Sequence, residues 1–273
     1  MKSTGIKAVL FDLDDTLFDH QHSSRSALRA LRQTFNGFRQ TSIEELEVEH
    51  ARLLEKYHQR VIRGRMTLKA SREERFRELL QAYGESATPT NAEKAAKIYS
   101  EIYLENRRAT PGAIALLEAL HPQVKTAIIS NHLVAEQIEK IQVCGLTNLL
   151  DEMIISEEAG VAKPHPSIFK LALQRLGTDP RDVVMVGDNW ENDILGAANV
   201  GIPNFWLNRY NLRCPNTAIT TEIHALEPLE PLLEQILNPI DPAKITVPED
   251  DNDPKKHFFD SEWGIVTRPD KLK

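Results

Sequence analysis

The sequence predicts an α/β fold: a Rossmann-like parallel sheet with helices on both faces and an inserted all-helical domain. Short apolar runs, partly β-branched, alternate with segments of helical periodicity, which is typical of parallel sheets covered by helices. The block 20–107 breaks this alternation, because it has helical periodicity and many charges but no convincing strand. The length of 273 residues suits a core domain with a smaller partner, and an apolar content of 41% suffices for a buried core.

Five runs are expected to form the strands of the sheet. Each is short and largely apolar, as strands buried on both faces of a parallel sheet are. The strands are expected at residues 6–12, 124–130, 153–156, 183–187 and 204–207. The intervening helices are expected near residues 111–121, 132–145, 164–177 and 190–200.

The inserted block is expected to contain four helices. They are expected near residues 22–35, 43–62, 67–83 and 90–107. Ser42 and Thr90 are each followed three residues later by a glutamate, a pattern typical of a helix N-terminus. We therefore expect a core domain formed by residues 1–19 and 108–238, with residues 20–107 as a separate helical domain.

The last segment, residues 239–273, is expected to be an extended tail. It is rich in proline and contains an acidic run at 249–251, a composition typical of chain without a packed core. Its aromatic residues Phe258, Phe259 and Trp263 are expected either to pack on their own domain or to bind a partner.

The composition excludes several classes of protein. A net charge of −7 disfavours binding to a nucleic acid polymer, since such binders are more often basic. Cys144 and Cys214 stand alone, so a zinc site is not expected, and two isolated thiols fit a reducing compartment. No signal peptide or membrane span is expected, which favours a cytoplasmic location. The oligomeric state is left undetermined.

A group of acidic residues follows the first predicted strand. Asp12 ends that strand, at the sheet edge where open α/β folds bind ligands. Asp14 comes two residues later, so in extended geometry it would point to the same side as Asp12. Two adjacent carboxylates repel each other unless a cation or a shared proton compensates. The alternative is a turn rich in aspartate, which explains Asp14 and Asp15 but not the apolar strand that leads into Asp12.

Four segments together resemble the signatures of the haloacid dehalogenase superfamily. Residues 12–17 (DLDDTL) resemble its first motif, DxDxT, and residues 124–131 (VKTAIISN) its second, a strand that ends in Ser or Thr. Residues 161–169 (VAKPHPSIF) resemble the third motif, and residues 184–194 (VMVGDNWENDI) the fourth, GDxxxxD. The four occur in the family's order, and the inserted domain, residues 20–107, resembles a cap placed after the first motif.

The resemblance implies a Mg²⁺-dependent phosphatase that forms an aspartyl-phosphate intermediate. Asp12 would be the nucleophile, and Asp14 would protonate the leaving alcohol and then activate water. Mg²⁺ would be bound by Asp12, by the main-chain carbonyl of Asp14 and by Asp188, which are the hard oxygen ligands this ion prefers. Asp193 would hold a metal-bound water or orient Lys163. The alternatives are a simple Gly-Asp turn for Asp188 and a solvated helix residue for Asp193.

The same resemblance implies a phosphate site. Ser130 and the main-chain N–H of Asn131 would bind the phosphoryl oxygens at a strand-to-helix turn, and Lys163 would add positive charge. The alternative for Ser130 is a helix cap, and for Lys163 an ordinary surface lysine. His165 departs from the aspartate often seen in the third motif, which puts any role for that position in doubt.

The substrate is expected to be a small phosphorylated metabolite. The motifs and cap look most like the branch of pyrimidine 5′-nucleotidases and N-acylneuraminate-9-phosphatases, which suggests a nucleoside monophosphate or a sugar phosphate. In the cap, four arginines are candidates for a second anionic group, or else form a solvated basic face: Arg63, Arg65, Arg72 and Arg75.

Three rival functions stay open. A 2-haloacid dehalogenase would use the same nucleophile on carbon, without metal, and usually lacks an acid–base aspartate such as Asp14. A phosphosugar mutase would share the intermediate but return the phosphate to its substrate. A non-catalytic binding protein should have lost some of the charged residues, all of which this chain retains.

Overall fold

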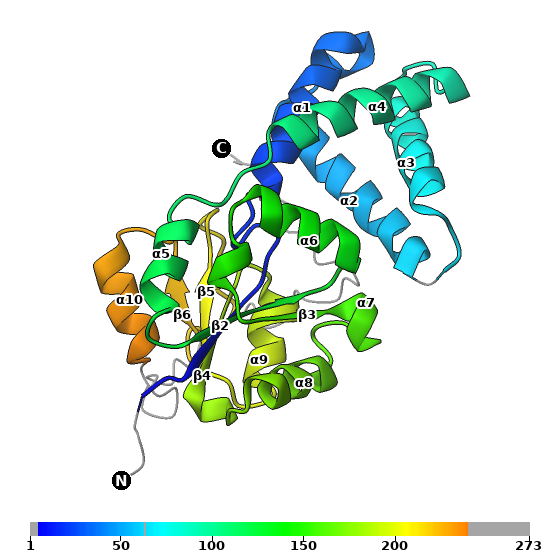
Figure 1. The fold of residues 1–273 in the computed structure, drawn as a ribbon. Coiled ribbons are helices and arrows are strands. Elements are labelled where there is room, and N and C mark those ends of the chain that lie inside the picture. The colour runs from blue at the N-terminus through cyan, green and yellow to red at the C-terminus, as the bar shows by residue number, and fades with distance from the viewer. Residues whose placement is uncertain (1–4, 63, 240–273) are drawn as a thin grey trace, which may run out of the picture. The chain divides into compact units, whose positions relative to one another are not determined.

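The computed structural model describes residues 5–62 and 64–239. The described residues form two compact units, one containing residues 5–19 and 108–239 and the other His20–Arg107 (Figure 1). The predicted tail, residues 239–273, lies outside the described residues except for Pro239, and so do its three aromatic residues. None of the helices in the described part of the chain combines the length and the apolar character needed to cross a membrane.

The first unit is built on a six-stranded parallel sheet in the order β3-β2-β1-β4-β5-β6. The strands are β1 (Ala8–Phe11), β2 (Lys125–Ser130), β3 (Glu152–Ile155), β4 (Val183–Gly187), β5 (Asn204–Leu207) and β6 (Thr221–Ile223). The predicted α/β class is confirmed. Four of the six strands fall within the expected runs, and β3 begins one residue before its run. Strand β6 was not expected, because it is a three-residue edge strand that contains Thr221 and Glu222 rather than an apolar run.

Helices cover both faces of this sheet. They are α5 (Ala113–Leu120), α6 (Val134–Val143), α7 (Ser156–Ala159), α8 (Pro166–Leu176), α9 (Gly196–Ala198) and α10 (Leu229–Leu237), with 3₁₀ turns at Thr147–Leu149 and Pro180–Asp182. Helices α8 and α9 pack on one face, whereas α5 and α10 lie together on the other (Figure 1). The expected helix 190–200 is divided, because Trp190–Leu195 forms a π-helical turn before α9.

Strand β1, at the centre of the sheet, is packed on both of its faces. All four of its residues are fully buried. Ala8 and Leu10 contact the cluster beneath α8, which includes Phe169, so by alternation Val9 and Phe11 face the opposite layer. Removing a buried aromatic ring such as that of Phe169 typically costs about 3–5 kcal/mol. The nucleophile candidate therefore follows a strand that is held from both sides.

The second unit is all-helical. It comprises α1 (His20–Thr34), a 3₁₀ turn (Asn36–Phe38), α2 (Ile43–Ile62), α3 (Leu68–Ala82) and α4 (Pro89–Glu105). Helix α2 begins with a reciprocal capping box, since the main-chain N–H of Glu45 donates to Ser42 Oγ and that of Ser42 donates to the Glu45 carboxylate. The expected cap at Thr90 was wrong. Thr88 caps α4 by accepting from the N–H of Asn91, because Pro89 takes the first helical position.

The two crossings between the units are tied together on the core side. The main-chain N–H of Asp19 donates to the Arg108 carbonyl at 3.0 Å, and that of Thr110 donates to the Leu17 carbonyl at 2.9 Å. The Asp19 carboxylate, 1% exposed, accepts from Arg108 at 2.7 and 2.9 Å and from Arg209 at 2.9 Å. Burial alone would raise the pKa of Asp19, but the hydrogen bonds from Arg108 and Arg209 outweigh it and lower this pKa. We call Asp19, Arg108 and Arg209 together the Asp19 clamp.

Candidate active site

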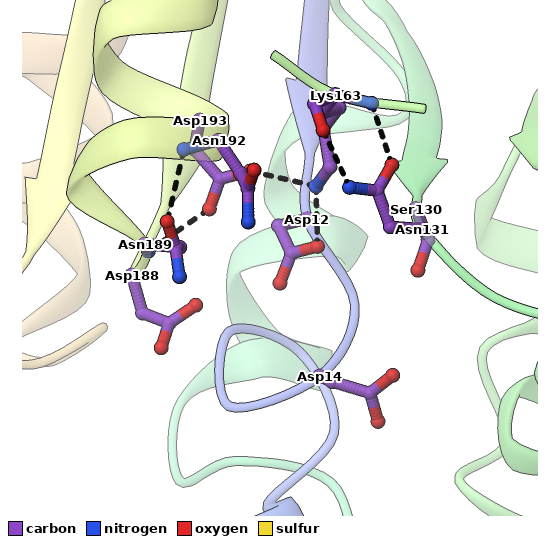
Figure 2. A pocket seen from close by; sticks show the side chains of 9 residues that line it. All are labelled: Asp12, Asp14, Ser130, Asn131, Lys163, Asp188, Asn189, Asn192 and Asp193. Atoms are coloured by element: carbon purple, nitrogen blue, oxygen red, sulfur yellow. Dashed lines mark hydrogen bonds and ion pairs between the residues drawn. The ribbon is translucent and has the colours of Figure 1, made fainter. Parts of the chain in front are cut away.

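A small pocket of about 180 Å³ lies at the carboxyl ends of the central strands (Figure 2). Its position follows from the fold, since the carboxyl ends of parallel strands meet at one edge of the sheet. The pocket is lined by Asp12, Asp14, Ser130, Asn131, Lys163, Asp188, Asn189, Asn192 and Asp193. The structure thus brings all seven site residues expected from the sequence into one cavity and adds Asn189 and Asn192.

Three carboxylates crowd one side of this pocket. Oxygen atoms of Asp12, Asp188 and Asp193 lie within 4.8 Å of one another. The Lys163 Nζ lies 2.6 Å from Asp12 Oδ1 and 2.6 Å from Asp193 Oδ1. The side chain of Lys163 is 2% exposed, so the surface-lysine alternative is wrong. One lysine therefore faces three carboxylates, which leaves an excess of negative charge in a buried place.

This excess charge perturbs the acidities. Burial raises the pKa of Asp12, Lys163 opposes this change and Asp193 reinforces it, and the net result is a pKa of about 7. Burial also raises the pKa of Asp188 well above its usual value, reinforced by the charges of Asp12 and Asp15. Burial would lower the pKa of Lys163, but its two carboxylate partners raise it, so this lysine stays charged.

The donor set fits a hard divalent cation. Carboxylate and carbonyl oxygens are the ligands that Mg²⁺ prefers. Asp188 points into the pocket beside Asp12 (Figure 2), and its carboxylate accepts a long hydrogen bond, 3.5 Å, from Thr16 Oγ1. Burial, reinforced by repulsion between the carboxylates, raises the pKa of Asp12 and of Asp188, so keeping both ionised in this pocket requires additional positive charge. A cation between them would supply that charge.

Asp193 is held in place from both ends of its carboxylate. Its Oδ1 accepts from Lys163, and its Oδ2 accepts from the main-chain N–H of Asn189 at 3.0 Å. The π-helical turn that carries Asp193 packs against Gly187, where a Cβ atom would lie 2.5 Å from the Asp193 Cβ. Glycine at the end of β4 thus permits Asp193 to approach Lys163.

The turn after β2 connects the expected phosphate site to Lys163. The Asn131 side chain donates to the Lys163 carbonyl at 2.8 Å and accepts from its main-chain N–H at 2.7 Å. Ser130, 2% exposed, accepts a hydrogen bond from the Gln137 side chain. Helix α6 begins after Leu133 with no side-chain cap, so the capping alternative for Ser130 is wrong.

His165 is the N-cap residue of helix α8. It is exposed, and its Nδ1 accepts from the main-chain N–H of Ser167, which caps α8. An aspartate in this position could accept the same hydrogen bond, since both side chains offer an acceptor at the cap. The departure from the family pattern at His165 therefore leaves the placement of Lys163 unaffected.

Asp14 differs from the expectation. Its carboxylate points away from that of Asp12 (Figure 2). It is bound by Lys140 at 2.6 and 2.9 Å and by Gln137 at 2.9 Å. The expectation of a common direction was wrong because the chain leaves the extended conformation after β1, and Asp15 has a φ of +62°. Asp14 still lines the pocket.

Gln137 and Lys140 contact residues of the pocket but were not among the site residues expected from the sequence. The signal for Gln137 was its place on the predicted helix 132–145. With Val134, Ile138 and Ile141 it forms the i, i+3, i+4, i+7 pattern of a buried face, where a polar residue is unusual. Lys140 follows three residues after Gln137 and carried no comparable signal.

The three arginines proposed for substrate binding that lie within the described residues differ in their exposure. Arg65 and Arg72 are exposed, whereas Arg63 lies outside the described residues. Arg75 is 6% exposed, and its guanidinium lies over the rings of Phe76 and Tyr99. Arg75 is thus part of the core of the helical unit and not of a solvated basic face.

An aspartate at the end of the central strand, a buried lysine and a carboxylate cluster on a Rossmann-like sheet are the combination that the four sequence motifs led us to expect. The model of the haloacid dehalogenase-like hydrolase family matches residues 6–201. The chain therefore belongs to this family.

Several relatives are phosphatases. Pyrimidine 5′-nucleotidase YjjG of Escherichia coli is 42% identical over 125 residues, which are 45% of this chain and 56% of that protein. Glyceraldehyde 3-phosphate phosphatase of Methanopyrus kandleri is 32% identical over 208 residues, 75% of this chain and 84% of that protein. N-acylneuraminate-9-phosphatase of Homo sapiens is 27% identical over 220 residues, 75% and 83% of the two chains. This chain is accordingly a phosphoric monoester hydrolase.

Solved structures show the same fold. The HAD hydrolase YfnB of Bacillus subtilis, in a magnesium-bound form, superposes with a TM-score of 0.65 at 24% identity, over 84% of this chain and 99% of that chain. A 2-haloacid dehalogenase of Pseudomonas syringae superposes with a TM-score of 0.53 at 26% identity, over 84% and 99%. The fold is thus shared by members that act on different bonds, so the site has to decide the chemistry.

Proposed function

We propose that this protein is a Mg²⁺-dependent phosphatase that hydrolyses a nucleoside monophosphate or a sugar phosphate through an aspartyl-phosphate on Asp12. The observation that carries the proposal is the buried contact between Asp12 and Lys163, beside Asp188. A carboxylate is a poor nucleophile towards an anionic phosphate unless its charge is compensated and its position is fixed. Lys163 fixes the position of Asp12 and compensates part of its charge, and a cation between Asp12 and Asp188 would compensate the rest.

The first half of the reaction would transfer the phosphoryl group to the protein. An oxygen of Asp12 attacks phosphorus while the bond to the leaving oxygen breaks, and Asp14, which has to enter this step in its protonated form, gives that oxygen its proton. Mg²⁺, held by Asp12, Asp188 and the Asp14 carbonyl, would neutralise charge on the phosphoryl group. Lys163, Ser130 and the main-chain N–H of Asn131 would bind the phosphoryl oxygens as charge develops on them.

The second half would release the phosphate. Asp14, now ionised, takes a proton from water as the water oxygen attacks phosphorus, and the bond to Asp12 breaks to regenerate its carboxylate. Inorganic phosphate leaves, and Asp14 has regained the proton it donated. Asp14 acts in both halves of the reaction. It must therefore reach the side of phosphorus opposite Asp12, where the alcohol oxygen leaves in the first half and the water oxygen enters in the second.

The substrate class rests on the relatives. Their names include a pyrimidine nucleotidase, glyceraldehyde 3-phosphate phosphatases and N-acylneuraminate-9-phosphatases. Each of these names refers to a nucleotide or to a phosphorylated sugar. The pocket at the carboxylates has a volume of about 180 Å³, which suits a phosphoryl group rather than a whole nucleotide. We infer that the phosphoryl group enters this pocket while the rest of the substrate stays outside.

The test is a phosphate-release screen. Nucleoside monophosphates, sugar phosphates and p-nitrophenyl phosphate are incubated with the protein in Mg²⁺ or in EDTA. Release that requires Mg²⁺ and is abolished in Asp12→Asn supports the proposal. Asp179→Asn is the matched control, because Asp179 is an exposed aspartate before the amino end of β4. Full activity in Asp12→Asn would refute the mechanism.

The same assays separate the rival functions. Asp14 and Asp188 favour phosphoryl transfer over dehalogenation, since attack on carbon needs neither an acid–base aspartate nor a metal. Halide release from 2-haloacids in EDTA would reverse this assignment. Return of the phosphate to another position on the sugar, without free phosphate, would identify a mutase instead.

A further inference from the structure

Helix α6 buries two polar side chains beside the pocket. Gln137 is fully buried and Lys140 is 7% exposed, and they lie one helical turn apart on the same face as Ile141. Neither residue lines the pocket itself. Both therefore act on the pocket through the residues they contact.

Lys140 holds the carboxylate of Asp14 by both oxygens. Its Nζ lies 2.6 Å from Asp14 Oδ1 and 2.9 Å from Asp14 Oδ2. The ammonium group also lies 5.4 Å from the ring centroid of Phe18, which is fully buried. A lysine between a carboxylate and an aromatic face has little freedom to move, so the direction of the Asp14 side chain is fixed as well.

Gln137 joins Asp14 to the phosphate site. Its Nε2 donates to Asp14 Oδ2 at 2.9 Å and to Ser130 Oγ at 2.6 Å. Asp14 accepts hydrogen bonds here, which fixes the orientation of the amide with its nitrogen towards these two oxygens. Ser130 accepts the hydrogen bond through an oxygen lone pair, so its own O–H remains to donate to a phosphoryl oxygen.

Stability alone does not account for these residues. A buried ion pair is often no more stabilising than apolar side chains of similar volume, because both partners lose their hydration. The Gln137 Oε1 adds a cost, since this buried atom has no hydrogen-bond partner among the described residues. Leucine or methionine at positions 137 and 140 would avoid both costs.

We propose that Lys140 and Gln137 are positioning residues: Lys140 holds Asp14 on the side of the pocket away from Asp12, and Gln137 orients the Ser130 hydroxyl towards the phosphoryl group. In an in-line displacement the leaving oxygen departs opposite the attacking oxygen. A carboxylate that pointed at Asp12 would be on the wrong side for this task. The direction of Asp14 that contradicted the sequence expectation is thus the direction that its acid–base role needs.

The proposal rests on the proposed function and makes two separate predictions. In Lys140→Met, kcat should fall about 10- to 100-fold, which is part of the 10²–10⁴-fold that a positioned acid–base group supplies. The loss should be larger for an alkyl phosphate, whose leaving oxygen needs a proton, than for p-nitrophenyl phosphate, whose leaving group does not. In Gln137→Leu, inorganic phosphate should inhibit at least several-fold more weakly, because Ser130 loses its orientation.

The experiment compares kcat, KM and inhibition by inorganic phosphate in the wild type, both variants, Lys140→Arg and Asp14→Asn. Lys140→Arg should recover part of the rate, and Lys140→Met should lower kcat no further in the Asp14→Asn background. Lys170→Met is the matched control, since Lys170 is exposed on α8. Thermal unfolding of every variant separates a lost fold from lost positioning.

Three outcomes would overturn the inference. They are an unchanged or increased kcat in Lys140→Met, an equal loss for alkyl and aryl phosphates, and a further additive loss in the double variant. A wild type that releases no phosphate from any substrate in the screen would instead defeat the proposed function, so the two failures are distinguishable.

Discussion

The acidities in the pocket predict that Mg²⁺ stabilises the folded protein more at pH 8 than at pH 5.5. An aspartate whose pKa is raised from 3.8 to about 7 when the protein folds gives up about 4 kcal/mol of stability once it is ionised. The sign follows from proton binding: between these two pKa values the folded state of Asp12 keeps a proton that the unfolded state has lost. The stability of the metal-free protein therefore falls as pH rises through this window, and Asp188 acts in the same direction.

A divalent cation reverses this effect because it binds the ionised carboxylates. At a hundredfold excess over its dissociation constant, a ligand stabilises the folded state by about 2.7 kcal/mol. For a unit of this size that corresponds to a rise in Tm of roughly 5–10 °C. At pH 5.5 protons compete for Asp12 and Asp188, so the same Mg²⁺ concentration should produce a much smaller rise.

Scanning calorimetry with Mg²⁺ or EDTA at the two pH values measures the four Tm values needed. Asp12→Asn should lose most of the pH dependence of the Mg²⁺ effect, whereas Asp179→Asn should keep it. Equal Mg²⁺ shifts at pH 5.5 and 8 in the wild type would refute the reasoning, because the carboxylates would then not be the groups that bind the ion.

Three further substitutions test the rest of the site. Lys163→Met should lower kcat by about 10²–10³-fold and raise the pKa of Asp12 further, measured by steady-state rates and by pH titration of the metal-free protein. Gly187→Ala should cost about 1–3 kcal/mol in thermal unfolding and reduce kcat, since the new Cβ displaces Asp193, whereas Gly5→Ala in open space should change neither. Asp19→Asn should cost about 3 kcal/mol above pH 4, because two arginines lose their carboxylate, and the cost should vanish as the pH falls below the lowered pKa of Asp19.

The opposite results are equally specific. A wild-type rate in Lys163→Met would remove this lysine from the chemistry. A stable and active Gly187→Ala would mean that the turn carrying Asp193 can move without loss, and an Asp19→Asn variant as stable as the wild type would show that the Asp19 clamp contributes nothing measurable.

The sequence was informative where a single physical rule decides the outcome. Buried parallel strands need continuous apolar runs, so β1, β2 and β4 could be predicted and their polar ends placed at one edge of the sheet. That placement brings Asp12, Asp188 and Ser130 into one pocket. The roles of these residues in catalysis stay predictions until they are measured.

The direction of Asp14, strand β6 and the contacts of Lys140 could not be predicted, because they depend on features that a linear sequence pattern does not encode. The direction of Asp14 depends on where the strand ends and the chain turns. The aspartate-rich turn that we gave as an alternative for Asp14 and Asp15 indicated this turn, and Asp15 has a positive φ there, but the turn alone did not predict which way the Asp14 side chain points. Strand β6 pairs through its main chain and has little apolar pattern. The contacts of Lys140 join positions 126 residues apart, which only the folded chain brings together.

The Asp19 clamp has a practical consequence for exchanging parts between members of the family. Asp19, Arg108 and Arg209 all belong to the sheet-bearing unit. Their hydrogen bonds join the two segments at which the chain enters and leaves the helical insertion. A chimera that replaces residues 20–107 would leave every bond of the clamp in place, whereas a cut a few residues further into the core would remove either Asp19, which both arginines contact, or Arg108, which makes two of the three hydrogen bonds to Asp19. We therefore expect that residues 20–107 can be exchanged at this junction without loss of the hydrogen bonds among Asp19, Arg108 and Arg209.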